Sequence, residues 1–103
     1  MNLGEKVLLS EKRKSKILIV DDVPENVEFV EACLSVEPYD IITASSGKEA
    51  IQKLKEEKFD IILLDVMMPE ISGYEVCKIV KNNPETQFVP VLMLTALSEL
   101  EDR

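Results

Sequence analysis

The chain of 103 residues contains no histidine and no tryptophan, and only 5% of its residues are aromatic. Without histidine it lacks the commonest general base and zinc ligand, so its chemistry must use carboxylates, hydroxyls, lysines or a bound ion. The two cysteines, Cys33 and Cys77, form no CxxC pair, and we expect both to be reduced thiols in the core. No apolar run is nearly as long as a membrane-spanning segment, which needs about 18 residues, and the N-terminal residues show no signal-peptide pattern. These features favour a cytoplasmic location and no membrane contact.

Charge is negative overall and unevenly distributed. The net charge is −8, yet residues 1–16 carry +3, which leaves −11 on the rest of the chain. A body this acidic argues against direct nucleic-acid binding by this domain. Hydrophobic residues make up 46% of the sequence, enough for one domain with a core. We expect residues 1–15 to form an N-terminal leader and residues 16–103 to form the domain.

Apolar strand patterns alternate with helical ones. The runs Ile17–Val20 and Ile61–Leu64 are typical of strands buried on both faces of a parallel sheet. Two more strands are predicted at residues 39–44 and 91–94, and helices are predicted to begin near Pro24, Ser46 and Ser72. This order predicts the α/β class, with a doubly wound parallel sheet. The residues predicted to face the core are Val23, Val27, Val30 and Leu34 in the first helix, Ala50, Ile51 and Leu54 in the second, and Val76, Ile79 and Val80 in the third.

Acidic residues follow two of these strands. Asp21 and Asp22 come directly after the first strand, and Asp65 follows the third. Each alone reads as a turn former or helix cap, but ligands of open α/β sheets bind at the carboxyl ends of the strands. Because like charges this close together are costly, the three carboxylates predict a site for a divalent cation. Thr95 ends the fourth strand at the same edge.

These motifs, taken together and in order, make the chain similar to the receiver domain of two-component response regulators. The similarity covers about Lys16 to Arg103, and it is carried by residues 17–22, 61–69 with Gly73, and 91–96. The resemblance implies a flavodoxin-like sheet with strand order 2-1-3-4. It also implies that Asp65 is the phosphoacceptor and that Thr95 is the switch hydroxyl.

The resemblance further implies a magnesium ion and a phosphodonor. Mg²⁺ would be held by Asp21, Asp22, Asp65 and the backbone carbonyl of Met67, and the Ala96 amide would contact the phosphoryl group. That group would come from a histidine kinase or a phosphotransfer protein. The chain would then be a signalling phosphoacceptor and not itself an enzyme. Residues 66–69 and 73–77 most resemble receivers fused to output domains that make or degrade cyclic dinucleotides.

The sequence also departs from the receiver pattern. Receivers continue with a fifth strand, which carries a phosphoryl-binding lysine and an aromatic switch residue, and with a fifth helix. None is found here, and neither Lys48 nor Lys78 is placed to replace that lysine. We therefore expect strand five and helix five to be missing, and the exposed edge of strand four to favour self-association.

Two alternative functions follow from these departures. One is a receiver-fold interaction module that is not phosphorylated, because the lysine is absent. The other is a Mg²⁺-dependent aspartyl phosphatase. Such enzymes usually place their two acids two residues apart after the first strand, whereas Asp21 and Asp22 are adjacent.

Overall fold

The computed structural model describes residues 14–94, which form four strands and three helices. No helix in this part of the chain is long and apolar enough to cross a membrane. In chain order the elements are β1 (Lys16–Val20), α2 (Pro24–Leu34), β2 (Asp40–Ala44), α3 (Gly47–Glu56), β3 (Ile61–Asp65), α4 (Gly73–Asn82) and β4 (Val91–Leu94).

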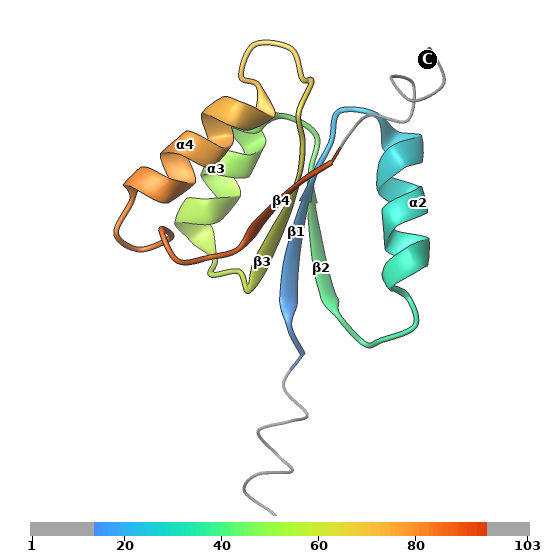
Figure 1. Cartoon of the computed structure of the whole chain (residues 1–103). Helices are drawn as coiled ribbons and strands as arrows, with labels where there is room; N and C mark the ends of the chain where they lie inside the picture. Colours follow the sequence, from blue (N-terminus) through green and yellow to red (C-terminus); the bar gives the residue numbers. More distant parts are fainter. Residues whose placement is uncertain (1–13, 95–103) are drawn as a thin grey trace, which may run out of the picture.

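All four strands run parallel, in the order β2-β1-β3-β4. Figure 1 shows α2 on one face of this sheet and α3 and α4 together on the other. Each connection between strands that are consecutive along the chain passes through a helix, as parallel strands require. The predicted doubly wound sheet with order 2-1-3-4 is confirmed.

Alternation along β1 divides the core into two apolar clusters. Leu18 and Val20 belong to the larger cluster, which α3 and α4 complete with Ala50, Val76 and Val80 among others. Ile17 and Ile19 belong to the smaller cluster under α2. Because successive side chains of a strand point to opposite faces, a wholly apolar strand is stable only where both faces are covered.

The two serines predicted to begin helices do so. The Glu49 amide donates to the Ser46 hydroxyl oxygen at 3.1 Å, and the Glu75 amide donates to that of Ser72 at 3.3 Å. The Glu49 carboxylate in turn accepts from the amide and hydroxyl of Ser45, one residue earlier than in the standard capping box. Both helix starts are thus stabilised by side chains that the sequence supplies locally.

For three residues the prediction of a place in the core is wrong. Val23 is 38% exposed and Ile79 is 43% exposed, and Cys33 also lies at the surface. Val23 is the residue that caps α2, so its side chain precedes the helical stripe formed by Val27, Val30 and Leu34. No residue of α2 is fully buried, whereas the second cysteine, Cys77, does pack partly against the larger cluster.

Leu18→Ala should destabilise the fold by about 2 to 5 kcal/mol, because it leaves a cavity at a fully buried position of the larger cluster. Urea unfolding followed by circular dichroism measures the loss. Val36→Ala is the control, since Val36 is 84% exposed and should change the free energy of unfolding by less than about 0.5 kcal/mol. Equal losses in the two variants would contradict this assignment of the core.

Candidate functional site

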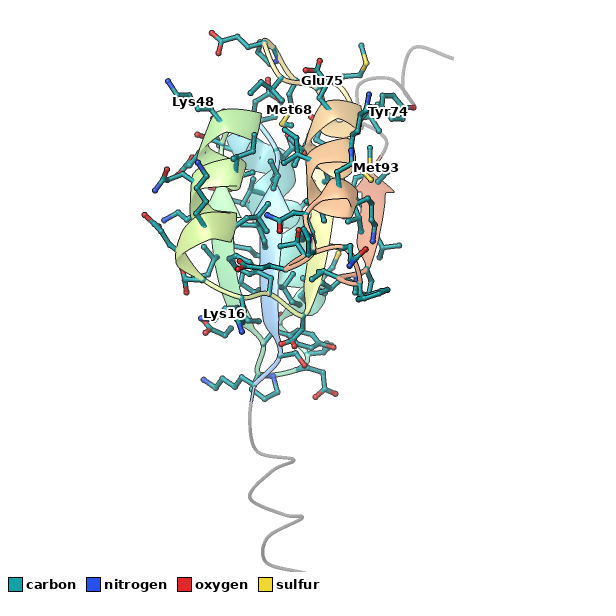
Figure 2. All side chains as sticks on the ribbon, turned by 90° about the vertical axis from the view of Figure 1, so that its left-hand side faces the viewer. Lys16, Lys48, Met68, Tyr74, Glu75 and Met93 are labelled. Atoms are coloured by element: carbon teal, nitrogen blue, oxygen red, sulfur yellow. The ribbon has the colours of Figure 1, made fainter. Side chains whose placement is uncertain are left out.

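Parallel pairing of β1 with β3 brings the acidic residues together. Val20 is the register partner of Leu64, so Asp21 and Asp65, the next residues on each chain segment, emerge side by side. One carboxylate oxygen from each of Asp21, Asp22 and Asp65 lies within 4.8 Å of the others. Figure 2 shows Met68, in the loop after Asp65, at the end of the sheet opposite Lys16, which begins β1. The predicted convergence of three carboxylates at one sheet edge is therefore present.

Two of these carboxylates are buried. Asp21 is 4% exposed and Asp65 is 2% exposed. Each accepts a hydrogen bond from a backbone amide two residues further on, from Val23 at 2.9 Å to Asp21 Oδ1 and from Met67 at 3.4 Å to Asp65 Oδ1. The Asp21 amide donates to the Ala44 carbonyl at 3.1 Å, which ties the site to the end of β2.

Burial and repulsion act together on Asp65. Desolvation, then the negative charge of Asp21, raises the pKa of Asp65 to about 6, with a smaller contribution from Asp22. The hydrogen bond from the Met67 amide opposes this rise in the pKa but does not cancel it. Within residues 14–94 no lysine or arginine forms an ion pair with any of the three carboxylates. The cluster thus lacks a positive partner in the described part of the protein.

The loop between β3 and α4 is held close to Asp65. The Gly73 amide donates to the Val66 carbonyl at 3.0 Å, and a Cβ atom at position 73 would overlap the carbonyl oxygen of Asp65. Only glycine permits this approach. Within the same loop Glu70 has a φ of 65°, which is strained for a residue with a side chain.

The donor set suits a hard cation. Carboxylates and backbone carbonyls are the oxygen ligands that Mg²⁺ takes in proteins, usually with only one or two carboxylates and several waters. Mutual repulsion and burial, the causes of the raised pKa, are also what a dication would relieve. The residues present therefore fit a magnesium ion.

Two predicted site residues, Thr95 and Ala96, lie outside the described residues. The residue before them, Leu94, is the register partner of Asp65 across the β3–β4 pair. Sequence reasoning did not identify the contact between Gly47, the first residue of α3, and Ile71, which lies in the loop between β3 and α4. In the sequence Gly47 stands out only as part of the capping motif from Ser46 to Glu49. A contact between segments distant in sequence leaves no local pattern.

The fold and the site define a class of protein, namely doubly wound α/β domains with a cluster of acidic side chains at the carboxyl edge of the sheet. The family model described as "Response regulator receiver domain" matches residues 17–103. The chain therefore belongs to the response regulator receiver family, and receiver domains are signalling domains.

Curated relatives agree with this family. A protein of Vibrio cholerae named as a probable cyclic di-GMP phosphodiesterase is 48% identical over 86 residues, which are 84% of this chain and 19% of that protein. Response regulator PleD of Caulobacter vibrioides is 44% identical over 89 residues, which are 86% of this chain and 20% of that protein. The chain thus spans about a fifth of the length of these relatives.

Solved structures agree as well. Chemotaxis response regulator CheY4 of Vibrio cholerae matches with a TM-score of 0.76 and 35% identity, over 88% of this chain and 76% of that one. Response regulator TrrA of Thermotoga maritima, solved in complex with Mg²⁺ and beryllium fluoride, matches with a TM-score of 0.74 and 35% identity, over 85% of this chain and 75% of that one.

Asp65→Asn should stabilise the metal-free protein at neutral pH. The folded-state pKa of Asp65, about 6, lies above its ordinary value of 3.8, so native stability falls as Asp65 ionises between about pH 4 and pH 7. Asparagine does not ionise, and the variant should be about 2 to 3 kcal/mol more stable at pH 7 but within about 1 kcal/mol of the wild type at pH 4. Urea unfolding in chelator at several pH values measures this. A difference independent of pH would contradict the raised pKa.

Proposed function

We propose that this chain is a phosphoacceptor receiver domain in which Asp65 takes a phosphoryl group from a histidine kinase or a phosphotransfer protein. The observation that supports this is the buried Asp65 carboxylate, whose oxygen lies within 4.8 Å of those of Asp21 and Asp22 at the carboxyl edge of a receiver fold. The domain would comprise residues 16–103, with residues 1–15 as a leader, and the cytoplasm stays the predicted location.

Asp21, Asp22, Asp65 and the Met67 carbonyl would hold Mg²⁺. When bound, the ion would neutralise charge on the transferring phosphoryl oxygens. Asp65 ends β3, and its carboxylate accepts a hydrogen bond from the Met67 amide. The carboxylate is therefore oriented before the phosphodonor arrives. Orientation of this kind supplies much of the acceleration of phosphoryl transfer, because the protein has little covalent chemistry to do.

In the transfer itself, an oxygen of the Asp65 carboxylate attacks phosphorus. The N–P bond of the donor phosphohistidine breaks, and its electron pair returns to the imidazole nitrogen. A pKa of about 6 leaves most Asp65 carboxylates ionised at neutral pH, so the nucleophile needs no separate base.

The Thr95 hydroxyl and the Ala96 amide would then contact the new phosphoryl group, and Thr95 would act as the switch residue that turns toward it. Support comes from the register, because Leu94, the residue before Thr95, pairs with Asp65. A newly added phosphoryl group carries charge and three acceptor oxygens, which such donors can satisfy. The output would belong to a larger regulator, and one relative is named as a probable cyclic di-GMP phosphodiesterase.

Incubation with acetyl phosphate and Mg²⁺ should add one phosphoryl group to the wild-type chain, detected by intact mass. Asp65→Asn should remove the labelling, and so should chelation of Mg²⁺, because the nucleophile and the cation are each required. Asp40→Asn is the matched control, since Asp40 is a carboxylate that begins β2 at the opposite end of the sheet from Asp65.

Equal labelling of the Asp65→Asn variant would refute the assignment of the phosphoacceptor. No labelling of the wild type, together with binding of Mg²⁺ and beryllium fluoride, would indicate slow chemistry at a correct site. Absence of both would favour the unphosphorylated interaction module. Turnover of a generic phosphate ester would instead indicate the phosphatase.

We also propose that β4 pairs with a second copy. Within residues 14–94 its only strand partner is β3, and Leu92 is 53% exposed. Sedimentation should show dimers at high micromolar concentration, and Leu92→Lys should shift them to monomers, because charge blocks edge pairing. Val36→Lys, at an exposed position before β2, should leave the dimer intact. Monomers at every concentration would contradict the proposal.

A further inference from the structure

The loop of residues 66–72, which follows the phosphoacceptor, is in close contact with the first turn of α3. A Cβ atom at position 47 would lie 2.8 Å from the Cβ of Ile71, 2.9 Å from its Cγ2 and 3.0 Å from its carbonyl oxygen. Distances this short are not tolerated between carbon atoms, so Ile71 and Gly47 fit only because Gly47 has no side chain. Gly47 and Gly73 are two of the three glycines in the chain, and each lies in a tight contact with this loop or its end.

Space, and not backbone conformation, requires glycine at position 47. No glycine in the described residues has a positive φ, and Gly47 is the first residue of α3. Alanine is a much stronger helix former than glycine, so the helix by itself would favour alanine here. The glycine is therefore explained by its partner in the loop.

The same short segment also contacts the other half of the site. Ala44, three residues before Gly47, accepts the Asp21 amide at 3.1 Å. Between them Ser45 and Ser46 hold the turn, through their hydrogen bonds with Glu49. Residues 44–47 thus contact the strand end that carries Asp21 and also the loop that follows Asp65.

A displacement of Ile71 would also displace the rest of the loop, which includes Met67 next to the acidic site. The Ile71 amide donates to the Pro69 carbonyl at 2.8 Å, and the Gly73 amide, just after the loop, donates to the carbonyl of Val66 at its start. Ile71 and the buried Met68 both pack on the larger apolar cluster, so the loop cannot slide without repacking. Figure 2 shows Met68 between the ends of α3 and α4.

From these contacts we propose that Gly47 is a positioning residue for the phosphoacceptor site. It touches neither the ion nor the phosphoryl group. Instead it sets, through Ile71, the distance between the Met67 carbonyl and the Asp21 and Asp65 carboxylates. This inference rests on the proposed function, because it assigns Gly47 a role in the Mg²⁺ site proposed there.

The test compares Mg²⁺ affinity with stability in the full chain. Gly47→Ala should weaken Mg²⁺ binding about tenfold, the scale seen when a group that orients metal ligands is lost. Titration followed by amide shifts of residues 64–68 measures affinity, and urea unfolding measures the folded fraction. Lys48→Ala, one residue along at an exposed position, should bind Mg²⁺ as the wild type does.

A second pair of variants approaches the contact from the other side and avoids any clash. Ile71→Ala and Ile42→Ala remove the same atoms from half-buried positions on the larger cluster, but the three atoms nearest to a Cβ at position 47 all belong to Ile71. Both should lose similar stability, whereas only Ile71→Ala should lose Mg²⁺ affinity. Gly47→Ala should also weaken binding less in an Ile71→Gly background, where the Cβ and Cγ2 contacts are gone.

The outcomes separate this inference from the proposed function. If the wild type binds no Mg²⁺, the proposed function fails first. If the wild type binds and the folded Gly47→Ala variant binds equally well, Gly47 is not a positioning residue. If Gly47→Ala does not fold, equal Mg²⁺ affinity of Ile71→Ala and Ile42→Ala overturns the inference, and a loss confined to Ile71→Ala supports it.

Discussion

Parallel pairing between β1 and β3 is the contact on which the site depends. The register runs from Ile17 opposite Ile61 to Val20 opposite Leu64, and it ends at the two buried aspartates. A slip of one residue would move every side chain of β1 from one apolar cluster to the other, so the packing of both clusters favours this register. Core packing therefore places the two acids, although neither acid contributes to the core.

The acids themselves work against stability. Asp21 and Asp65 are almost fully buried, and the raised pKa of Asp65 records the free-energy cost of charging it there. The surrounding strands tolerate this cost because their apolar faces are covered on both sides. A cation bound at this cluster would relieve the repulsion between carboxylates that the fold has already imposed.

The loop after Asp65 also contains a strained residue, which indicates that its backbone is held in one conformation. Glu70 adopts a left-handed conformation, which typically costs a residue with a side chain about 1 to 3 kcal/mol. It persists because the loop is fixed on both sides of it, by the Met67 amide on Asp65 and by the close contacts of Ile71 and Gly73. Such fixed backbone is useful where a carbonyl must face a metal ion.

The sequence alone was enough for the strands, their order along the chain, the helix caps and the three acids, because each depends on local pattern. Apolar runs such as Ile17–Val20 can be stable only between covered faces, and an acid after such a run must emerge at the sheet edge. The strand order 2-1-3-4 came from the resemblance to receivers and not from any local pattern.

Tertiary structure decided what depends on neighbours distant in sequence. Val23 and Ile79 continue the apolar pattern of their helices, yet they lie outside the packed faces. The fit of Ile71 onto Gly47 and the closeness of Gly73 to the Asp65 carbonyl join segments that no periodicity connects. The sequence specifies which side chains are present, but only the packed fold determines which residues distant in sequence come into contact.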